Sequence, residues 1–137
     1  MRKVFKKILC PINLRHAEHK QRAYEEAVRM AHNHGAELIV ATVAPEIERN
    51  LNIRDSRKFW GDKLEEFLKN NPPGDIPFQQ IVRIGSPHRQ IVKLADEENV
   101  DLIVMEAANP KVSDYLLGTT STHVVSHSRA SVYVVRV

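Results

Sequence analysis

Short apolar runs rich in β-branched residues alternate with longer segments of helical spacing along this chain. No other feature constrains the fold as strongly. The five runs are Lys7–Ile12, Glu37–Val43, Phe78–Ile84, Leu102–Met105 and Ser131–Val135. Apolar side chains fall at both odd and even positions, which is typical of strands covered on both faces. Strands separated by helices in this way predict right-handed crossovers and a parallel sheet.

The segments between the runs carry the marks of four helices. The first is expected from about Glu18 to His34, with Gly35 as its C-cap. A second lies between positions 45 and 70. Its core face is predicted to hold Phe59, Leu64, Phe67 and Leu68.

The third helix begins at Ser86, with serine at the N-cap and Pro87 at the first helical position. The fourth is predicted over Thr119–His127. We therefore expect an α/β fold, a three-layer doubly wound sheet of five parallel strands. Nothing marks a linker or an internal repeat, so we expect one domain over residues 1–137.

Composition excludes several classes of partner. The net charge of +3 is small, basic residues are interspersed with acidic ones, and aromatic residues make up only 6%. A nucleic-acid surface is therefore not expected. No apolar run approaches the roughly 18 residues needed to span a membrane. A single cysteine, Cys10, fits a reducing cytoplasm and a buried, inert thiol inside the first strand.

Open parallel sheets bind ligands at the carboxyl ends of their strands, where the strand order reverses. The loops expected there are Pro11–Leu14 and Glu106–Leu117, and the second is unusually long. It leads to Gly118, followed by four hydroxyl residues at a helix start. The amides and hydroxyls of such a start can hold an anion. Alternatively, the glycine closes a loop and the hydroxyls cap a helix, and these residues alone leave both interpretations open.

Several segments, in order and spacing, resemble one family over essentially the whole chain. They are Ile8–Asn13, Val40–Val43, Gly85–Pro87, Asp101–Met105, Leu117–Thr119 and Ser131–Val135. The sequence is similar to the universal stress protein family. This resemblance implies a Rossmann-like fold of the adenine nucleotide alpha hydrolase type with strand order 3-2-1-4-5.

The nucleotide signature of that family reads Gly, two residues, Gly, nine residues, then Gly-Ser or Gly-Thr. Here Glu106 and Asn109 stand at the first two glycines, and eight residues separate Asn109 from Gly118. Pro110 and the segment Tyr115–Thr119 resemble a branch with a shortened, proline-containing loop, whose members can still hold ATP.

The resemblance also implies a set of contacts to the nucleotide. The adenine pocket would be lined by Pro11, Ile12, Asn13 and Val43. The ribose and inner phosphates would lie near Met105, Glu106 and Ala107. The outer phosphates would be held by Gly118, Thr119, Thr120 and Ser121, with Lys111 as a helper. The cofactor implied is ATP, ADP or AMP, with Mg²⁺ accompanying ATP.

Two functions follow from these residues. The first is a protein that binds ATP as a regulatory or stress-response signal. Hydrolysis would be slow at most, because no general base is visible beside the hydroxyl residues, and no catalytic residue is assigned. The second is an interaction protein that binds no nucleotide because Glu106 blocks the crevice. In both, the resemblance implies a homodimer through Ser131–Val135, together with an unknown protein partner.

Histidine is the commonest metal ligand among side chains, and the chain contains seven. His123 and His127 lie four positions apart and are expected to share a face of the last helix. No third ligand of suitable type is evident in the sequence, so no metal site is expected. His88 follows Pro87 and is expected to be exposed.

Overall fold

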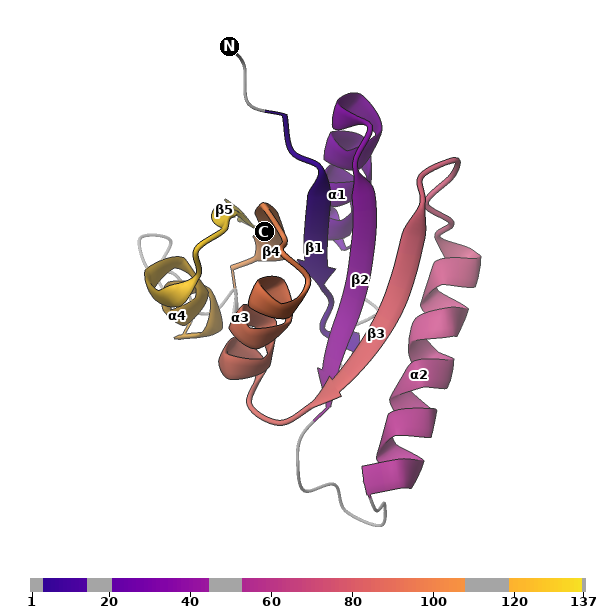
Figure 1. Cartoon of the computed structure of the whole chain (residues 1–137). Coiled ribbons are helices and arrows are strands. Elements are labelled where there is room, and N and C mark those ends of the chain that lie inside the picture. Colours follow the sequence, from indigo (N-terminus) through magenta and orange to yellow (C-terminus); the bar gives the residue numbers. More distant parts are fainter. Residues whose placement is uncertain (1–3, 15–20, 45–52, 108–118, 137) are drawn as a thin grey trace.

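The computed structural model describes residues 4–14, 21–44, 53–107 and 119–136, and these form an open parallel sheet flanked by helices (Figure 1). The strands are β1 (Lys7–Pro11), β2 (Glu37–Ala44), β3 (Phe78–Ile84), β4 (Leu102–Glu106) and β5 (Ser131–Val135). Their order in the sheet is β3-β2-β1-β4-β5, and the paired strands are parallel. The predicted fold class and strand order are confirmed.

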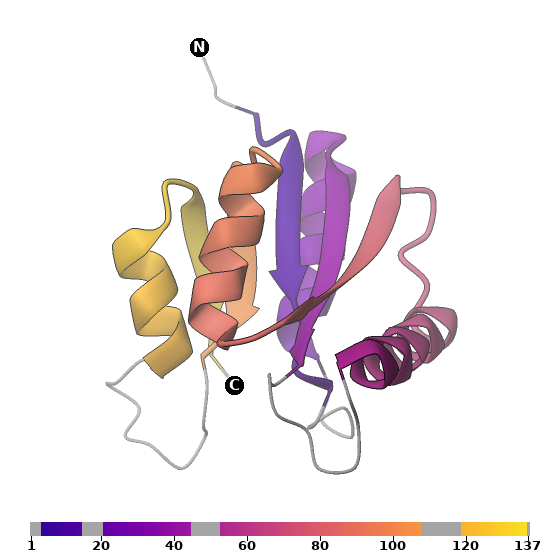
Figure 2. The same cartoon turned by 60° about the horizontal axis from the view of Figure 1, so that its bottom comes forward.

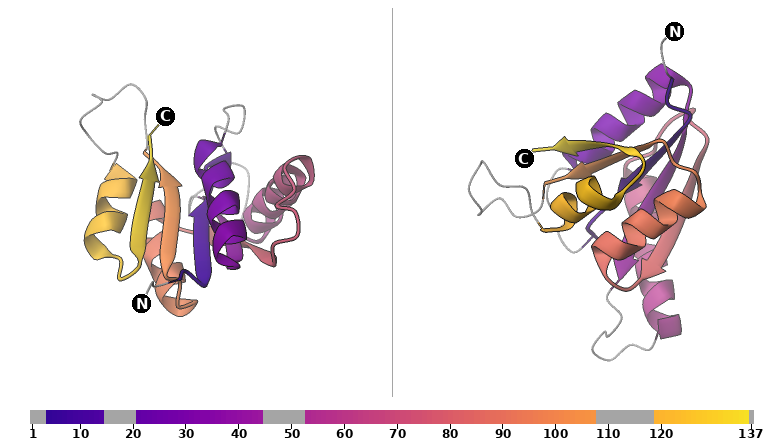
Figure 3. Two further views of the ribbon diagram at one scale, coloured as in Figure 1. Left: turned by 90° about the horizontal axis from the view of Figure 1, so that it is seen from above. Right: turned by 60° about the vertical axis from the view of Figure 1, so that its left-hand side comes forward.

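Helices cover both faces of this sheet. They are α1 (Arg22–His34), α2 (Ile53–Asn70), α3 (Pro87–Glu97) and α4 (Thr119–His127). Figure 2 shows α1 behind the strands and α3 in front of them, and Figure 3 shows α3 and α4 together on the face opposite α1. Two apolar clusters result, one packed on α1 and α2 and the other on α3 and α4.

The first helix begins later than predicted. Gln21 is its N-cap, so α1 starts at Arg22 and not near Glu18. Its predicted end is confirmed, because Gly35 has a φ of 65° and the amide of Ala36 donates to the carbonyl of Ala31 at 2.9 Å. Glycine adopts this left-handed conformation at little cost, so the chain can turn directly into β2.

The central strand β1 shows why apolar side chains occupy both odd and even positions in the sequence. Ile8, Leu9 and Cys10 of β1 have no exposed surface, and their side chains alternate between the two apolar clusters. Because helices cover both faces, neither parity can carry polar groups. The expectation of a buried Cys10 is confirmed.

The predicted core face of α2 is wrong at one position. Leu64 and Leu68 are buried and Phe67 packs against the core, but 41% of Phe59 is exposed. The buried stripe follows spacings of three and four from Leu64, and Phe59 lies outside it, at the edge of the Trp60 ring.

The buried face of α2 contains Leu64 but not Phe59, so we expect substitutions at these two residues to differ in their effect on stability. Leu64→Ala should lower the free energy of unfolding by about 2–5 kcal/mol, because a fully buried side chain leaves a cavity. Phe59→Ala, five residues earlier on the exposed side, should cost less than about 1 kcal/mol. Urea denaturation measures both values, and equal losses in the two variants would contradict the assigned face.

Candidate functional site

The strand order reverses between β1 and β4. The chain moves from β1 outward through β2 to β3, then crosses back to β4 and continues to β5. As a result α1, which follows β1, and α4, which follows β4, lie on opposite faces of the sheet (Figure 3). Connections that leave adjacent strands in opposite directions define the edge at which such folds bind ligands.

Hydrogen bonds continue the pairing of β1 beyond its last residue. The amide of Ile12 donates to the carbonyl of Ala41 at 2.7 Å, and the Thr42 hydroxyl donates to the carbonyl of Ile12 at 2.9 Å. Ile12 is buried, while Pro11 is half-buried and Asn13 is exposed. The backbone is therefore fixed where the predicted adenine contacts begin. The buried Thr42 was not identified from the sequence.

The end of β4 is fixed in a similar way. The amide of Ala107 donates to the carbonyl of Val135 at 3.0 Å, extending the β4–β5 pair. Met105 is buried in the cluster beneath α3 and α4. Because side chains alternate along a strand, Glu106 points to the opposite face, toward α1. The two residues predicted to meet the same ligand thus lie on different faces.

Glu106 contacts the start of α1. Its Oε2 accepts a hydrogen bond from the backbone amide of Ala23 at 3.3 Å, and the N-cap residue Gln21 provides no side-chain cap. Ala23 is the second residue of α1, so the carboxylate stabilises one of the amides that a helix start leaves without an intrahelical partner. The negative charge also interacts favourably with the helix dipole.

The same carboxylate lies close to Cys10. Burial, and secondly the charge of Glu106, raise the pKa of the Cys10 thiol far above its ordinary value. The thiol therefore stays protonated, which agrees with the inert role predicted for it. The sequence held one signal for the Glu106 contact: no Ser, Thr, Asp or Asn stands directly before Arg22.

The start of α4 presents two hydroxyl residues at the surface. Thr119 is exposed and Thr120 is half-buried, whereas Ser121 is fully buried, as is Val124 one turn later. The side chains of Ser121 and Val124 thus face the sheet. Lys111 and Gly118 lie outside the described residues, as do Asn109 and Pro110.

The histidines of α3 and α4 form a contact that the sequence did not predict. His123 and His127 share a face as expected, with ring centroids 4.7 Å apart. His88 was expected to be exposed, but it is half-buried with its ring centroid 4.0 Å from that of His123. Within the described ranges, no group of three or more His, Cys, Asp or Glu side chains is placed to hold a metal ion.

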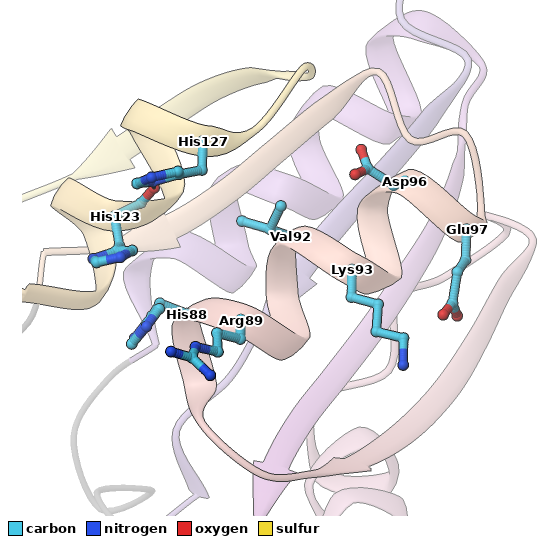
Figure 4. Close-up of a pocket in the computed structure, with 8 residues that line it drawn as sticks. All are labelled: His88, Arg89, Val92, Lys93, Asp96, Glu97, His123 and His127. Carbon is cyan, nitrogen blue, oxygen red and sulfur yellow. The ribbon is translucent and has the colours of Figure 1, made fainter.

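These histidines border a groove between α3 and α4 (Figure 4). Its lining comes from these two helices and includes no residue of β1 or β4: His88, Arg89, Val92, Lys93, Asp96, Glu97, His123 and His127. The groove is therefore separate from the strand edge at which the sequence predicted a ligand. In the part of the chain that the structure describes, no helix has the length and apolar character needed to cross a bilayer.

The fold is that of a doubly wound α/β protein. Its strand order reverses between the first and fourth strands, which is where proteins of this class bind ligands. The model of the Universal stress protein family matches residues 5–136, and the chain belongs to this family. It is 28% identical over 149 residues to the universal stress protein of Methanothermobacter thermautotrophicus, covering 99% of both chains.

Solved structures share the fold. A universal stress protein in complex with cAMP aligns with a TM-score of 0.76 at 21% identity, covering 98% of both chains. The universal stress protein from Archaeoglobus fulgidus in complex with dAMP aligns with a TM-score of 0.63 at 15% identity, covering 96% of this chain and 98% of that one. At these identities the likeness establishes the fold alone.

The Glu106 contact generates a prediction. Glu106→Gln should lower the free energy of unfolding by about 0.3–1 kcal/mol through loss of the charge beside the helix start. Glu106→Ala should cost about 1 kcal/mol because the amide of Ala23 loses its acceptor. Glu66→Gln, on the exposed side of α2, is the control and should change stability by less than about 0.5 kcal/mol. Denaturation that finds Glu106→Ala as stable as the parent protein would rule out the capping role.

Proposed function

We propose that this protein binds an adenine nucleotide, ATP foremost, at the carboxyl edge of the sheet between β1 and β4. The bound nucleotide acts as a regulatory or stress-response signal in the cytoplasm. The observation that carries the proposal is the reversal of strand order between β1 and β4, in a member of the universal stress protein family. Two proteins of the same fold are in complex with cAMP and dAMP, which supports an adenine ligand.

In this proposal one domain spans residues 1–137, and the strand ends divide the nucleotide between them. Pro11, Ile12, Asn13 and Val43 contact adenine, and Met105 and Ala107 lie beside the ribose and inner phosphates. The outer phosphates meet the start of α4, together with Gly118 and Lys111. We also propose that the chain belongs to the branch with the shortened loop, which Pro110 and the sequence of segment 115–119 support.

Ser121 takes a different part from the one that its hydroxyl suggests. Its side chain is buried against the sheet, so in this proposal it fixes the start of α4 and does not present a hydroxyl to the phosphates. The amides of the first helical turn lack intrahelical acceptors and point outward from the helix end. Thr119 and Thr120 add the hydroxyls that reach the surface.

The helix start alone is too weak to hold a nucleotide. It contributes roughly 0.3–1 kcal/mol toward an anion, whereas micromolar affinity requires about 8 kcal/mol. Burial of the adenine ring against Pro11 and Val43, and Mg²⁺ between the phosphates, supply the remainder in our proposal. Recognition therefore depends on the base as well as on the phosphates.

Signalling rather than catalysis is proposed because the described site residues include no group suited to act as a general base. Asn13 is an amide, and the Glu106 carboxylate accepts the Ala23 amide. Its position on the α1 side also favours an open crevice over one blocked by Glu106. Any hydrolysis of ATP is accordingly slow.

Nucleotide binding is tested by a thermal shift and one charge substitution. With Mg-ATP about 100-fold above its dissociation constant, the unfolding free energy should rise by about 2.7 kcal/mol. Thr119→Glu should weaken binding at least tenfold, or about 1.4 kcal/mol, because its carboxylate repels phosphates. An acidic residue at a helix start also favours the helix, so the fold should be retained.

Ser126→Glu supplies the matched control, since it adds the same charge two turns further along α4 at an exposed position. Calorimetric titration should find its affinity within about threefold of the parent value, because exposed charges are screened over about 10 Å. Absence of any Mg-ATP stabilisation in the parent protein would refute the proposed function. Equal affinity in Thr119→Glu would instead show that the phosphates lie elsewhere.

We further propose that β5 pairs with its copy in a second molecule to form a homodimer. The Ser131 amide donates to the carbonyl of Asp101, and the Val135 carbonyl accepts from Ala107, so odd-numbered residues of β5 bond toward β4. Even-numbered residues therefore direct their amides and carbonyls to the outer edge. An apolar edge strand left unpaired is an aggregation risk, which pairing removes.

Val132→Pro tests this pairing, because it deletes an outward amide and leaves the bonds to β4 in place. We expect sedimentation to find a dimer for the parent protein and a folded monomer for this variant. Val132→Thr keeps the amide and the β-branched shape, and it should stay dimeric. A dimer that persists in Val132→Pro would place the contact on another surface.

A further inference from the structure

Three histidine rings form a column between α3 and α4, with His123 in the middle (Figure 4). The His123 ring lies 4.0 Å from that of His88 at an interplanar angle of 38°. On the other side it lies 4.7 Å from that of His127 at 15°. The column therefore joins two helices that are separated in the chain by β4.

Hydrogen bonds hold both outer rings. Nδ1 of His127 donates to the carbonyl of His123 at 2.9 Å, which fixes its ring one turn further along α4. Nδ1 of His88 lies 3.3 Å from the Ser86 hydroxyl at the start of α3. Each outer ring is held by its own hydrogen bond and therefore stays next to His123. A proton gained by His123 lies at short range from two other imidazole rings.

The other charged groups near the column divide by position. Arg89 interacts with His123 and adds positive charge on the α3 side, and Lys93 lines the same groove. The acidic residues Asp96 and Glu97 occupy the far end of α3, where Glu97 pairs with Arg83 at 2.7 Å. The positive groups near His123 therefore oppose a positive charge on its ring.

We propose that this histidine column makes the contact between α3 and α4 sensitive to acid. Near neutral pH the uncharged His123 ring stacks between its two neighbours and helps to hold α4 against α3. As the pH falls and His123 takes up a proton, repulsion from the positive charge around it, including that of Arg89 on α3, loosens the contact. Histidine is the side chain whose ordinary titration falls in this range.

The titration of His123 sets the direction of the effect. Partial loss of surrounding water lowers the pKa of the exposed His123 ring below its ordinary value of 6.5, and the charges of His88, His127 and Arg89 lower it further. In the window between that lowered pKa and 6.5, the unfolded chain binds more protons than the folded one. Stability is therefore fully present above pH 6.5 and is lost as the pH falls through the pKa of folded His123.

The acid response does not depend on nucleotide binding. An effect of acid on nucleotide binding is a further step that rests on the proposed function. Because α4 begins at Thr119, a loosened α4 would disturb the proposed phosphate contacts.

The experiment is a histidine titration followed by proton NMR, without nucleotide. We expect the midpoint of His123 to lie below 6.5 and to rise toward that value in His88→Asn, which removes one neighbouring charge. His32→Asn, on the exposed side of α1, is the matched control and should leave the His123 midpoint unchanged. A His123 midpoint that does not move in His88→Asn would overturn the proposed coupling.

Denaturation at pH 7.5 and pH 5.5 provides the second readout. The parent protein and His32→Asn should lose more stability on acidification than His123→Asn, in which the middle ring is absent. The backbone carbonyl that holds His127 is retained in His123→Asn, so the helix keeps that bond. An equal loss in all three proteins would overturn the acid-sensitive contact, whatever the outcome of the nucleotide experiments.

Discussion

The parallel pairing of β1 between β2 and β4 is the constraint from which the other features follow. Ile8, Leu9 and Cys10 have no exposed surface, so β1 must be covered on both faces and paired on both edges. Parallel strands place all their carboxyl ends at one edge, and right-handed crossovers place α1 and α4 on opposite faces. The edge between β1 and β4 is thus set by burial before any ligand chemistry is considered.

Alternation along β4 then decides what each residue at this edge can contact. Met105 packs beneath α3 and α4, while Glu106 reaches the amide of Ala23 at the start of α1. Glycine occupies this position in the family signature that the sequence resembles. A carboxylate is accommodated here because α1 supplies it with a hydrogen-bond donor and a favourable dipole. The charge is therefore used inside the fold, on the α1 side of the sheet.

The sequence predicted those parts of the fold that depend on local pattern. Five apolar runs, a glycine after the first helix and a Ser-Pro pair before the third were sufficient for the element order. It could not predict contacts that depend on how separate elements meet. Glu106 and Ala23 are 83 positions apart, and the stacking of His88 on His123 requires α3 and α4 to lie side by side. The error at Phe59 has another cause. Successive side chains on a helix point about 100° apart, so an assignment that is wrong by one residue moves a side chain from the buried face to the exposed one.

We propose that an adenine nucleotide binds at the edge between β1 and β4. Backbone amide shifts recorded by NMR during titration with Mg-ATP test it most directly. We expect the largest changes on Asn13, Ala107 and the amides of Thr119 to Ser121. Changes confined to the groove between α3 and α4, or none at saturating nucleotide, would contradict it.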